Sequence, residues 1–437
     1  MKPQQIVSHM NKILILTAVT VCVSTSGWAA EKVLHTFQGS DGNGPRSTLI
    51  RDAAGNLYGT TELGGSANSG TVFELAKNAD GSWTENILYS FQAGNDGFGP
   101  WSGLTFDATG NLYGTTLEGG GSANCFDGCG TVFKLTKGSD GIWKESILYA
   151  FQGGNDAARP GNPLVFDAQG NLYGTTFYGG PTNCNTGCGF MYELTPTASG
   201  PWTETLLHMF GVGSDGENPS GPLVMDKSGN FFGTTSGGGT GNAGTVFELS
   251  PASTGGWNYS VIFNFDRTRG ATTGEYPEGG LIADAQGNLY GTTICGGSGV
   301  LQPGWTPCES FGYGNVFQLS PSAGGGWTQK VLFTFFGVKN ASFPTNPLVL
   351  DAAGNIYGTT AFGGNAQGIA DWTEGTAFKL TPNFSGTYSQ VVLRKFIWWN
   401  GGFTPFAGMV LDDQGNLYGT TYYGGSAGYG VVFEITP

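Results

Sequence analysis

Charged residues are scarce in this sequence, and basic residues are the scarcest of them. Asp, Glu, Lys and Arg together make up 11% of the 437 residues, with 18 Lys and Arg against 32 Asp and Glu, so the formal net charge is −14. A chain with so few basic side chains can neutralise few phosphates. We therefore expect no nucleic-acid partner and no binding to anionic lipid headgroups.

Histidines and helical patterns are also lacking. Beyond the N-terminal segment the only histidines are His35 and His208, and both lie two residues before a phenylalanine in the same part of a repeat. The sequence suggests no histidine cluster, carboxylate pair or catalytic triad, so we predict neither catalytic nor metal-ligating residues and lean against an enzyme. Outside the N-terminus no segment has a sustained apolar period of 3.6 residues, which argues against a helical fold.

The N-terminal segment has the pattern of a secretory signal peptide. Lys2 and Lys12 precede the apolar run from Ile13 to Val23, and the small residues Gly27 and Ala29 follow it. This order predicts cleavage after Ala29, and the run is too short to span a membrane. We expect a signal peptide over 1–29, a single domain over 30–437, and a secreted or periplasmic protein, with the cell surface as a further possibility.

Glycine is abundant, with 78 residues, and glycines recur at fixed positions of a repeat. The phrase Gly-Asn-(Leu/Ile/Phe)-(Tyr/Phe)-Gly-Thr-Thr occurs seven times, beginning at Gly55, Gly110, Gly170, Gly229, Gly287, Gly354 and Gly415. In one unit, strand A covers 104–107, strand B 111–116, strand C 130–135 and strand D 143–151, with tight glycine turns between them. Seven four-stranded antiparallel units of about 60 residues predict an all-β, seven-bladed β-propeller.

Strand D repeats an aromatic pair. Trp143 precedes Phe151 by eight residues, and the same spacing recurs in other units. Because side chains alternate along a strand, this even spacing predicts that both rings lie on one face and join neighbouring blades.

The last unit lacks strand D, and the missing strand stands at the other end of the domain. Val33 to Phe37 matches Asn86 to Phe91, whereas the chain stops soon after the strand C that contains Ile435. We therefore expect the N-terminal strand to complete the last blade and close the ring.

These repeated phrases, Leu-Tyr-Gly-Thr-Thr, Gly-Gly and Gly-Thr-Val-Phe, resemble those of the bacterial GloVer tandem-repeat family of secreted or surface-anchored proteins. The A-turn-B segment is more loosely similar to NHL and gluconolactonase-type propellers. The resemblance implies propeller-like repeats and export, and it implies no particular activity.

The variable B–C and D–A loops share one face of a propeller, and recognition is expected there. All six cysteines beyond the signal segment lie in B–C loops: Cys125, Cys129, Cys184, Cys188, Cys295 and Cys308. In an exported protein an even number predicts disulfides, and pairing within each loop is the simplest of the possible arrangements. Such bridges would either brace a recognition surface or simply stabilise the loops.

Aromatic residues of the same loops are the candidate ligand-binding residues: Trp101, Tyr276, Trp305, Trp372, Trp398 and Trp399. Flat rings suit stacking on sugars and contacts with proteins, although such rings also fill gaps between loops. The leading hypothesis is an exported, non-catalytic module that binds a glycan or an extracellular protein. The alternatives are a carbohydrate- or lactone-active enzyme with acids such as Glu275 and Glu278, and a structural surface protein.

No cofactor is expected, and we expect a monomer. Calcium is the one ion that the sequence leaves open, because Asp41, Asp96, Asp156 and Asp215 recur in D–A loops and could surround a shared ion. The simpler interpretation is that these residues form Asp-Gly turns.

Overall fold

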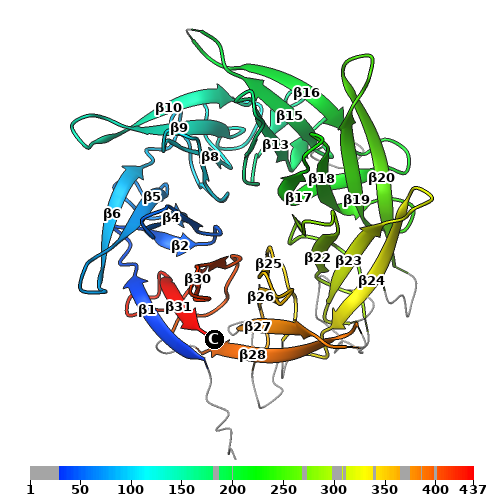
Figure 1. Ribbon diagram of the computed structural model, residues 1–437. Helices are drawn as coiled ribbons and strands as arrows, with labels where there is room; N and C mark the ends of the chain where they lie inside the picture. Colours follow the sequence, from blue (N-terminus) through cyan, green and yellow to red (C-terminus); the bar gives the residue numbers. More distant parts are fainter. Residues whose placement is uncertain are drawn as a thin grey trace, which may run out of the picture.

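The computed structural model describes residues 29–180, 187–198, 200–267, 273–297, 308, 312–337, 341–364, 375–384, 386–397 and 401–437. The described chain forms a ring of antiparallel sheets around a central axis (Figure 1). Each blade is one of the larger sheets, with strand A nearest the axis and strand D at the outside. The prediction of a seven-bladed, all-β propeller with four strands per blade is confirmed. The proposed signal segment lies almost wholly outside the described residues.

The blades follow one another along the chain. Blade 1 contains β3 (Ile50–Arg51), β4 (Leu57–Leu63), β5 (Thr71–Lys77) and β6 (Trp83–Ser90); blade 2, β7 (Thr105–Phe106), β8 (Leu112–Thr116), β9 (Thr131–Lys137) and β10 (Trp143–Ala150); blade 3, β12 (Val165–Phe166), β13 (Leu172–Thr176), β15 (Phe190–Thr195) and β16 (Thr203–Met209); blade 4, β17 (Gly216–Met225), β18 (Phe231–Gly238), β19 (Asn242–Pro251) and β20 (Trp257–Asp266). Blade 5 contains β21 (Leu281–Ala283), β22 (Leu289–Thr293), β23 (Asn315–Pro321) and β24 (Trp327–Thr334); blade 6, β25 (Val349–Leu350), β26 (Ile356–Thr360), β27 (Gly375–Pro382) and β28 (Tyr388–Phe396); blade 7, β29 (Val410–Leu411), β30 (Leu417–Thr421), β31 (Val431–Thr436) and β1 (Ala30–Thr36). The short strands β2 (Asn43–Pro45), β11 (Ala157–Ala158) and β14 (Tyr178–Gly179) belong to loops.

The ring closes through the two ends of the domain. Strand β1 pairs antiparallel with β31, so that Val33 lies opposite Phe433 and Thr36 opposite Val431. Figure 1 shows β1 as the outer strand beside β31. The predicted closure is therefore confirmed. Strand β1 supplies the strand D that the seventh repeat lacks, so the outer edge of β31 is paired.

Hydrophobic cores lie between the blades. At each of the seven interfaces, the phenylalanine that ends strand D meets an aromatic ring on strand C of the next blade, with ring centroids 4.9 to 5.3 Å apart. These contacts include Phe37 with Phe73, which crosses the closure between blades 7 and 1. Offset and edge-on ring contacts of this kind add to the free energy of burial.

The two aromatic rings of strand D do not lie on one face, contrary to the prediction from their spacing. Trp83 contacts Tyr418 of the preceding blade, whereas Phe91 contacts Phe133 of the following blade. Each strand D contains a β-bulge, which in blade 1 inserts Leu88 and reverses the alternation of side chains. The expectation that these rings join neighbouring blades is nevertheless correct.

A glycine and a proline fix the position of each blade against the next. The glycine before or at the start of strand C has no room for a side chain, because a Cβ there would lie 2.4 to 2.8 Å from Cδ of a proline in the following D–A connection. The seven pairs are Gly70–Pro100, Gly130–Pro160, Gly189–Pro219, Gly244–Pro277, Gly314–Pro344, Gly375–Pro405 and Gly430–Pro45. The D–A connections are thereby anchored at equivalent points around the axis.

Across the described ranges of the chain, we find no helix that is both long and apolar enough to cross a membrane.

Candidate binding site at the axis of the ring

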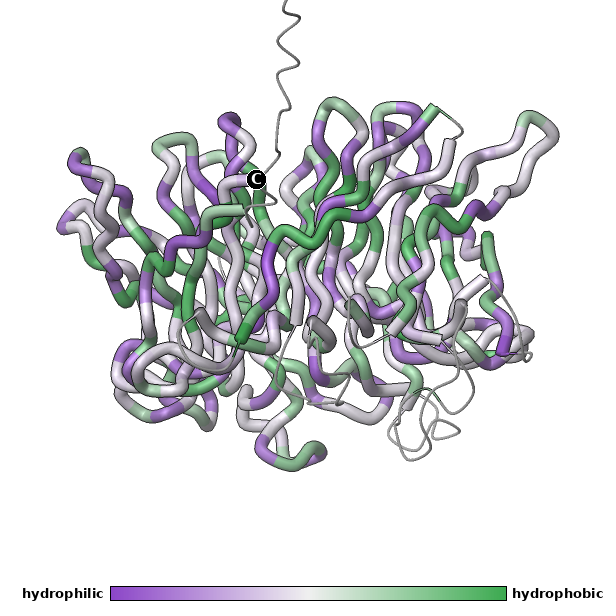
Figure 2. Tube along the Cα trace, turned by 90° about the horizontal axis from the view of Figure 1, so that it is seen from below, coloured by the Kyte–Doolittle hydropathy of each residue, from purple (hydrophilic) through white to green (hydrophobic). Residues whose placement is uncertain are grey.

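The D–A and B–C connections lie on the same face, as expected. Short antiparallel bridges join them within a blade, for example Phe98 to Glu118 and Phe403 to Tyr423. Figure 2 shows the ring from the side, with the connections gathered along two opposite faces. We call the face that carries these two kinds of connection the recognition face.

An axial cavity of about 310 Å³ opens between the D–A connections. The residue directly after the anchored proline of every blade lines this cavity. These seven residues are Arg46, Trp101, Gly161, Ser220, Glu278, Thr345 and Phe406. Because all seven blades contribute one equivalent residue, the cavity lies on the axis of the ring. We call these seven positions the cavity ring.

The backbone before the cavity ring is held in an unusual conformation. In all seven blades the residue before the proline has a φ between 55° and 68°. Only two are glycines; the others are Arg159, Asn218, Tyr276, Phe343 and Thr404. A left-handed conformation is costly for bulky and β-branched residues, particularly before proline. Such strain persists only where the surrounding packing imposes it, and it is frequently found next to functional sites.

One side of the cavity is cationic and aromatic. The guanidinium of Arg46 lies 3.8 Å from the centroid of the Trp101 ring and 5.4 Å from that of Phe406. It also forms an ion pair of 3.4 Å with Glu62. Stacking on Trp101 together with this ion pair holds the planar guanidinium in a defined orientation.

Across the cavity from Arg46, the connection that leads into blade 5 supplies a carboxyl group, that of Glu278. The side chain of Glu278 is exposed to solvent at the cavity, and protein atoms surround the opening in which it lies. Partial desolvation by this surrounding protein raises the pKa of Glu278, and the positive charge of Arg46 offsets part of the increase. The cavity therefore holds an acidic group and a cationic group on different connections.

Small residues complete the cavity ring. Gly161 leaves space that the Phe177 ring fills, since a Cβ at this glycine would lie 2.2 Å from that ring. Ser220 and Thr345 add hydroxyl-bearing side chains. The cavity thus combines rings, hydroxyls, one cation and one acid, a mixture typical of sites for small polar ligands.

The predicted aromatic residues have different positions. Trp101 lines the axial cavity. Tyr276 instead packs beside the Cys295–Cys308 bridge in a cluster with Phe343, and its hydroxyl accepts a hydrogen bond from Arg267. Trp305, Trp372, Trp398 and Trp399 lie outside the described residues.

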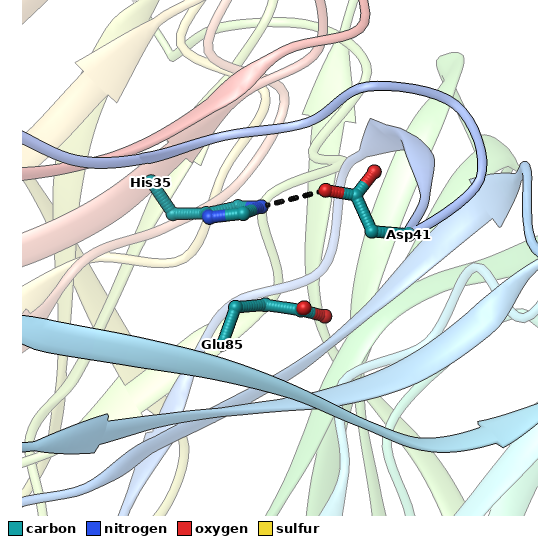
Figure 3. A group of neighbouring side chains, drawn as sticks. All are labelled: His35, Asp41 and Glu85. Carbon is teal, nitrogen blue, oxygen red and sulfur yellow. Dashed lines mark hydrogen bonds and ion pairs between the residues drawn. The ribbon is translucent and has the colours of Figure 1, made fainter.

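The four aspartates that could have surrounded one calcium ion are not brought together. Asp41 is hydrogen-bonded to His35 (Figure 3), Asp96 accepts from Tyr89, and Asp156 accepts from Tyr149. In the fourth loop, Asp215 is bonded to His208. Each carboxylate is thus engaged by the outer strand that leads into its own loop, so the four belong to four different interfaces between blades.

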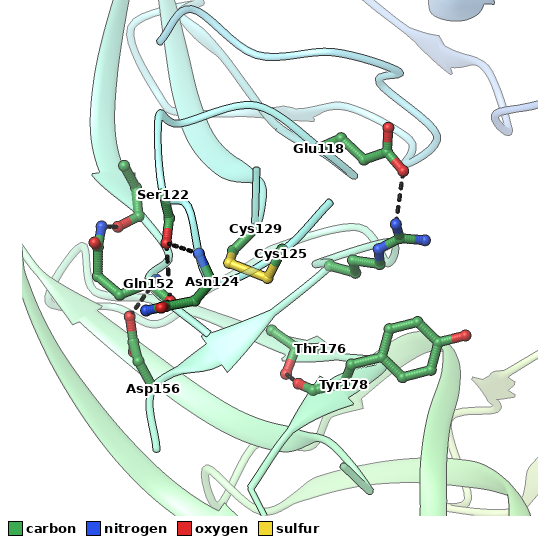
Figure 4. Close-up of a disulfide and its surroundings, with 11 residues drawn as sticks. Glu118, Ser122, Asn124, Cys125, Cys129, Gln152, Asp156, Thr176 and Tyr178 are labelled. Carbon is green, nitrogen blue, oxygen red and sulfur yellow. Dashed lines mark hydrogen bonds and ion pairs between the residues drawn. A yellow bond between two sulfur atoms is a disulfide. The ribbon is translucent and has the colours of Figure 1, made fainter. Parts of the chain in front are cut away.

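Disulfide bridges lie within B–C connections of the recognition face. The bridges Cys125–Cys129 and Cys295–Cys308 have Cα–Cα distances of 5.2 and 5.5 Å. Cys188 is also disulfide-bonded, whereas Cys184, its predicted partner, lies outside the described residues. Figure 4 shows the first bridge with Glu118 nearby, and Glu118 forms an ion pair with Arg159 in which the nitrogen and oxygen lie 2.8 Å apart.

Sequence reasoning missed the cavity ring, although the sequence carries its signal. A proline precedes strand A at the same place in all seven repeats, and the residue after it differs in every one. Attention to the largest aromatic residues identified Trp101 but overlooked Arg46 on the neighbouring connection.

The fold and cavity define a closed β-propeller with an axial site on its recognition face. The chain belongs to the Gloeobacter/Verrucomicrobia repeat family, whose repeat matches residues 19–137 and 122–304. The resemblance drawn from the repeated phrases is thus confirmed. No curated protein is similar to it in sequence at a significant level.

Solved structures are similar to this chain at low identity. A polysaccharide lyase, an ulvan lyase bound to a saccharide of glucuronic acid and sulfated rhamnose, is 11% identical with a TM-score of 0.53, over 91% of this chain and 94% of the lyase. Hydrazine synthase from Kuenenia stuttgartiensis is 13% identical with a TM-score of 0.49, over 90% and 96% of the two chains. A gluconolactonase from Xanthomonas campestris is 13% identical with a TM-score of 0.40, over 75% and 85%.

Proposed function

We propose that this protein is an exported binding module that holds a saccharide in the axial cavity. The observation that carries the proposal is the cavity ring, where one equivalent position in seven otherwise similar repeats bears seven different residues. Positions that serve the fold are alike from blade to blade, so a position that differs in every blade while lining one cavity is best explained by contact with a ligand.

The chemistry of the cavity favours a sugar. A saccharide presents apolar C–H faces, which suit the rings of Trp101 and Phe406, and hydroxyl groups, which suit Arg46 and Glu278. A volume of about 310 Å³ is at the lower end of the range for small-molecule sites. The ligand in the cavity is therefore one or two sugar units, either free or at the end of a longer glycan.

Export is part of the proposal. The disulfides Cys125–Cys129 and Cys295–Cys308 suit an oxidising compartment outside the cytoplasm, in agreement with the signal peptide predicted over 1–29. The ulvan lyase, which is similar in fold with a TM-score of 0.53, is bound to a saccharide in its solved structure.

A second function, carbohydrate cleavage, is favoured by one observation. Glu278 lines the axial cavity together with Arg46, where a bound ligand could contact both, and partial desolvation raises its pKa toward the range that suits a general acid or base. In that case Glu278 would exchange a proton with the bound sugar, and Arg46 would stabilise negative charge nearby.

The test is a binding screen of the purified protein against neutral and acidic oligosaccharides, followed by titration calorimetry of those that bind. We expect Trp101→Ala and Arg46→Ala to weaken binding by about tenfold or more. The control is Phe126→Ala, because Phe126 is an 83% exposed ring on the rim of the same face, away from the cavity.

The outcomes separate the hypotheses. If Phe126→Ala abolishes binding and Trp101→Ala does not, the ligand lies on the rim and the cavity proposal is wrong. If bound sugar is cleaved by the wild-type protein and not by Glu278→Gln, the protein is an enzyme. If no oligosaccharide binds, a structural surface protein becomes the better hypothesis.

A further inference from the structure

Polar side chains connect the outer strands of adjacent blades. In two successive interfaces a tyrosine on strand D donates a hydrogen bond to an aspartate in the following loop, and a glutamate from strand D of the next blade adds a second carboxyl group. These two groups are Tyr89–Asp96–Glu145 and Tyr149–Asp156–Glu204. We call each such group a seam.

The seam between blades 7 and 1 has a histidine in place of the tyrosine. His35 lies on β1, Asp41 in the loop that follows, and Glu85 on β6. The imidazole Nε2 lies 3.1 Å from Oδ2 of Asp41. One nitrogen or oxygen from each of the three residues lies within 4.8 Å of the other two. Figure 3 shows the carboxyl group of Glu85 beside the contact between His35 and Asp41.

The third member of this seam has an unused ligand atom. Oε1 of Glu85 is buried and has no hydrogen-bond partner in the described structure, as is also true of Oε1 of Glu145 and Glu204 in the tyrosine seams, so the histidine and not this oxygen distinguishes the site. A buried carboxylate oxygen without a partner is costly. The side chains of His35 and Asp41 are 19% and 17% exposed, so an ion from solvent can reach them.

We propose that His35, Asp41 and Glu85 form a site for a divalent transition-metal ion of the zinc class. One imidazole nitrogen and two carboxylate oxygens are ligands that zinc accepts at about 2.0–2.2 Å, and a water molecule can take the fourth position. Ligand atoms around such an ion lie about 3–3.5 Å apart, so small side-chain rotations close the site from its present spacing. Calcium is disfavoured because it takes oxygen ligands, and more of them.

The position of the site gives it a structural role. His35 belongs to the first strand of the domain, which completes blade 7, and Glu85 belongs to blade 1. A shared ion would therefore tie the closing strand to the next blade, at the one interface where the two ends of the domain meet.

A second histidine provides an internal control. His208 and Asp215 occupy the same places between blades 3 and 4, with Nε2 and Oδ2 2.8 Å apart. The third place is taken by Tyr259, whose ring is stacked on the imidazole at 3.6 Å. This seam has only two strong ligands, so it should not retain the ion.

The test uses the purified protein after removal of metals by a chelator. Zinc binding is measured by competition with a chromophoric chelator, and the midpoint of thermal unfolding is measured with zinc and, separately, with calcium. We expect one zinc ion per chain and a rise in the unfolding temperature with zinc that calcium does not reproduce.

Two variants and one control decide the matter. His35→Tyr introduces the residue found in the equivalent places Tyr89 and Tyr149, so the fold should tolerate it, and Glu85→Gln keeps the shape of the side chain. Each should weaken zinc binding about tenfold or more, whereas His208→Tyr should leave it unchanged. If zinc binds equally well to His35→Tyr and Glu85→Gln, or if zinc does not bind to the wild-type protein, the proposal is wrong.

Discussion

Two sets of equivalent positions in the seven blades can be compared directly. The aspartate that ends strand A is the same in every blade, and it accepts hydrogen bonds from the turn that follows, as Asp167 does from Asn171 and Tyr173. The residue of the cavity ring, after the anchored proline, differs in every blade. Both sets lie on the same rigid scaffold. The comparison teaches that a residue repeated in every blade is one that the fold requires. A position whose residue varies from blade to blade is instead available for contact with a ligand.

The largest effect on stability is expected when a side chain is added at the glycine that contacts a proline of the next connection in every blade. In Gly130→Ala the new Cβ would lie 2.5 Å from the carbonyl oxygen of Thr116 and 2.6 Å from Pro160. We expect a loss of about 3 kcal/mol or more in the free energy of unfolding, measured by denaturant titration. The matched control is Gly170→Ala, which has a similar positive φ and open space around it, and it should cost only about 1 kcal/mol. Equal losses in the two variants would show that backbone conformation, not close packing, sets the requirement.

The next largest effect is the pH dependence of stability that arises from the seam of Tyr149, Asp156 and Glu204. Burial, followed by the charge of Asp156 and by the hydrogen bond that the protonated carboxyl group donates to Asp156, raises the pKa of Glu204 to about 8. The folded state therefore holds a proton that the unfolded state has already lost, and stability should fall as the pH rises from about 4.5 to about 8. The loss should be on the order of 1 kcal/mol, since the side chain is partly solvated. The free energy of unfolding of Glu204→Gln should decline less over this pH range than that of the wild-type protein. If the two declines are equal, other titratable groups cause the decline.

A smaller effect is expected at the strained backbone before the cavity ring. Thr404 has a φ of 57°, and its buried hydroxyl has no hydrogen-bond partner in the described structure. Glycine occupies the equivalent position in two blades, at Gly44 and Gly99. We expect Thr404→Gly to raise the free energy of unfolding by about 0.5–1 kcal/mol, because relief of strain and of the unpaired hydroxyl exceeds the lost packing of Cβ and the methyl group and the added freedom of the unfolded chain. A loss of stability would mean that packing of the methyl group dominates.

The smallest effect on stability is expected within the cavity ring itself. Thr345→Ala removes a hydroxyl group that lines the cavity, and stability should change by less than about 0.5 kcal/mol. Binding of the saccharide found in the screen should nevertheless weaken, which calorimetry would detect. A large loss of stability would contradict the distinction between uniform and variable positions.

Much of the fold could be predicted because it repeats. The phrase around Gly110 recurs in seven copies, and the surplus strand at Val33 could be matched to the missing one after Ile435, so the closure followed from counting. The faces of the strand D rings could not be derived from spacing, because the bulge at Leu88 depends on how the outer strand curves around its neighbour.

The candidate sites were less accessible to sequence reasoning. Trp101 was named from the sequence for its size and Glu278 as a possible acid, whereas Arg46 was not named. The three residues line one cavity only because the ring brings three distant connections to one axis. The seam of His35 and Glu85 joins residues fifty positions apart on outer strands of different blades. Neither grouping has a local spacing that a sequence motif could capture.

The pairing of β1 with β31 also affects how the molecule assembles. Ala30 lies opposite Thr436, so this contact spans nearly the entire domain. Closing so long a loop costs conformational entropy and slows folding. The final blade cannot be completed until β31 (Val431–Thr436) has been made, so a chain interrupted before that strand would keep an exposed strand edge. Synthesis of β31 is thus a condition for a stable ring, and chains that lack it would be prone to aggregation or degradation.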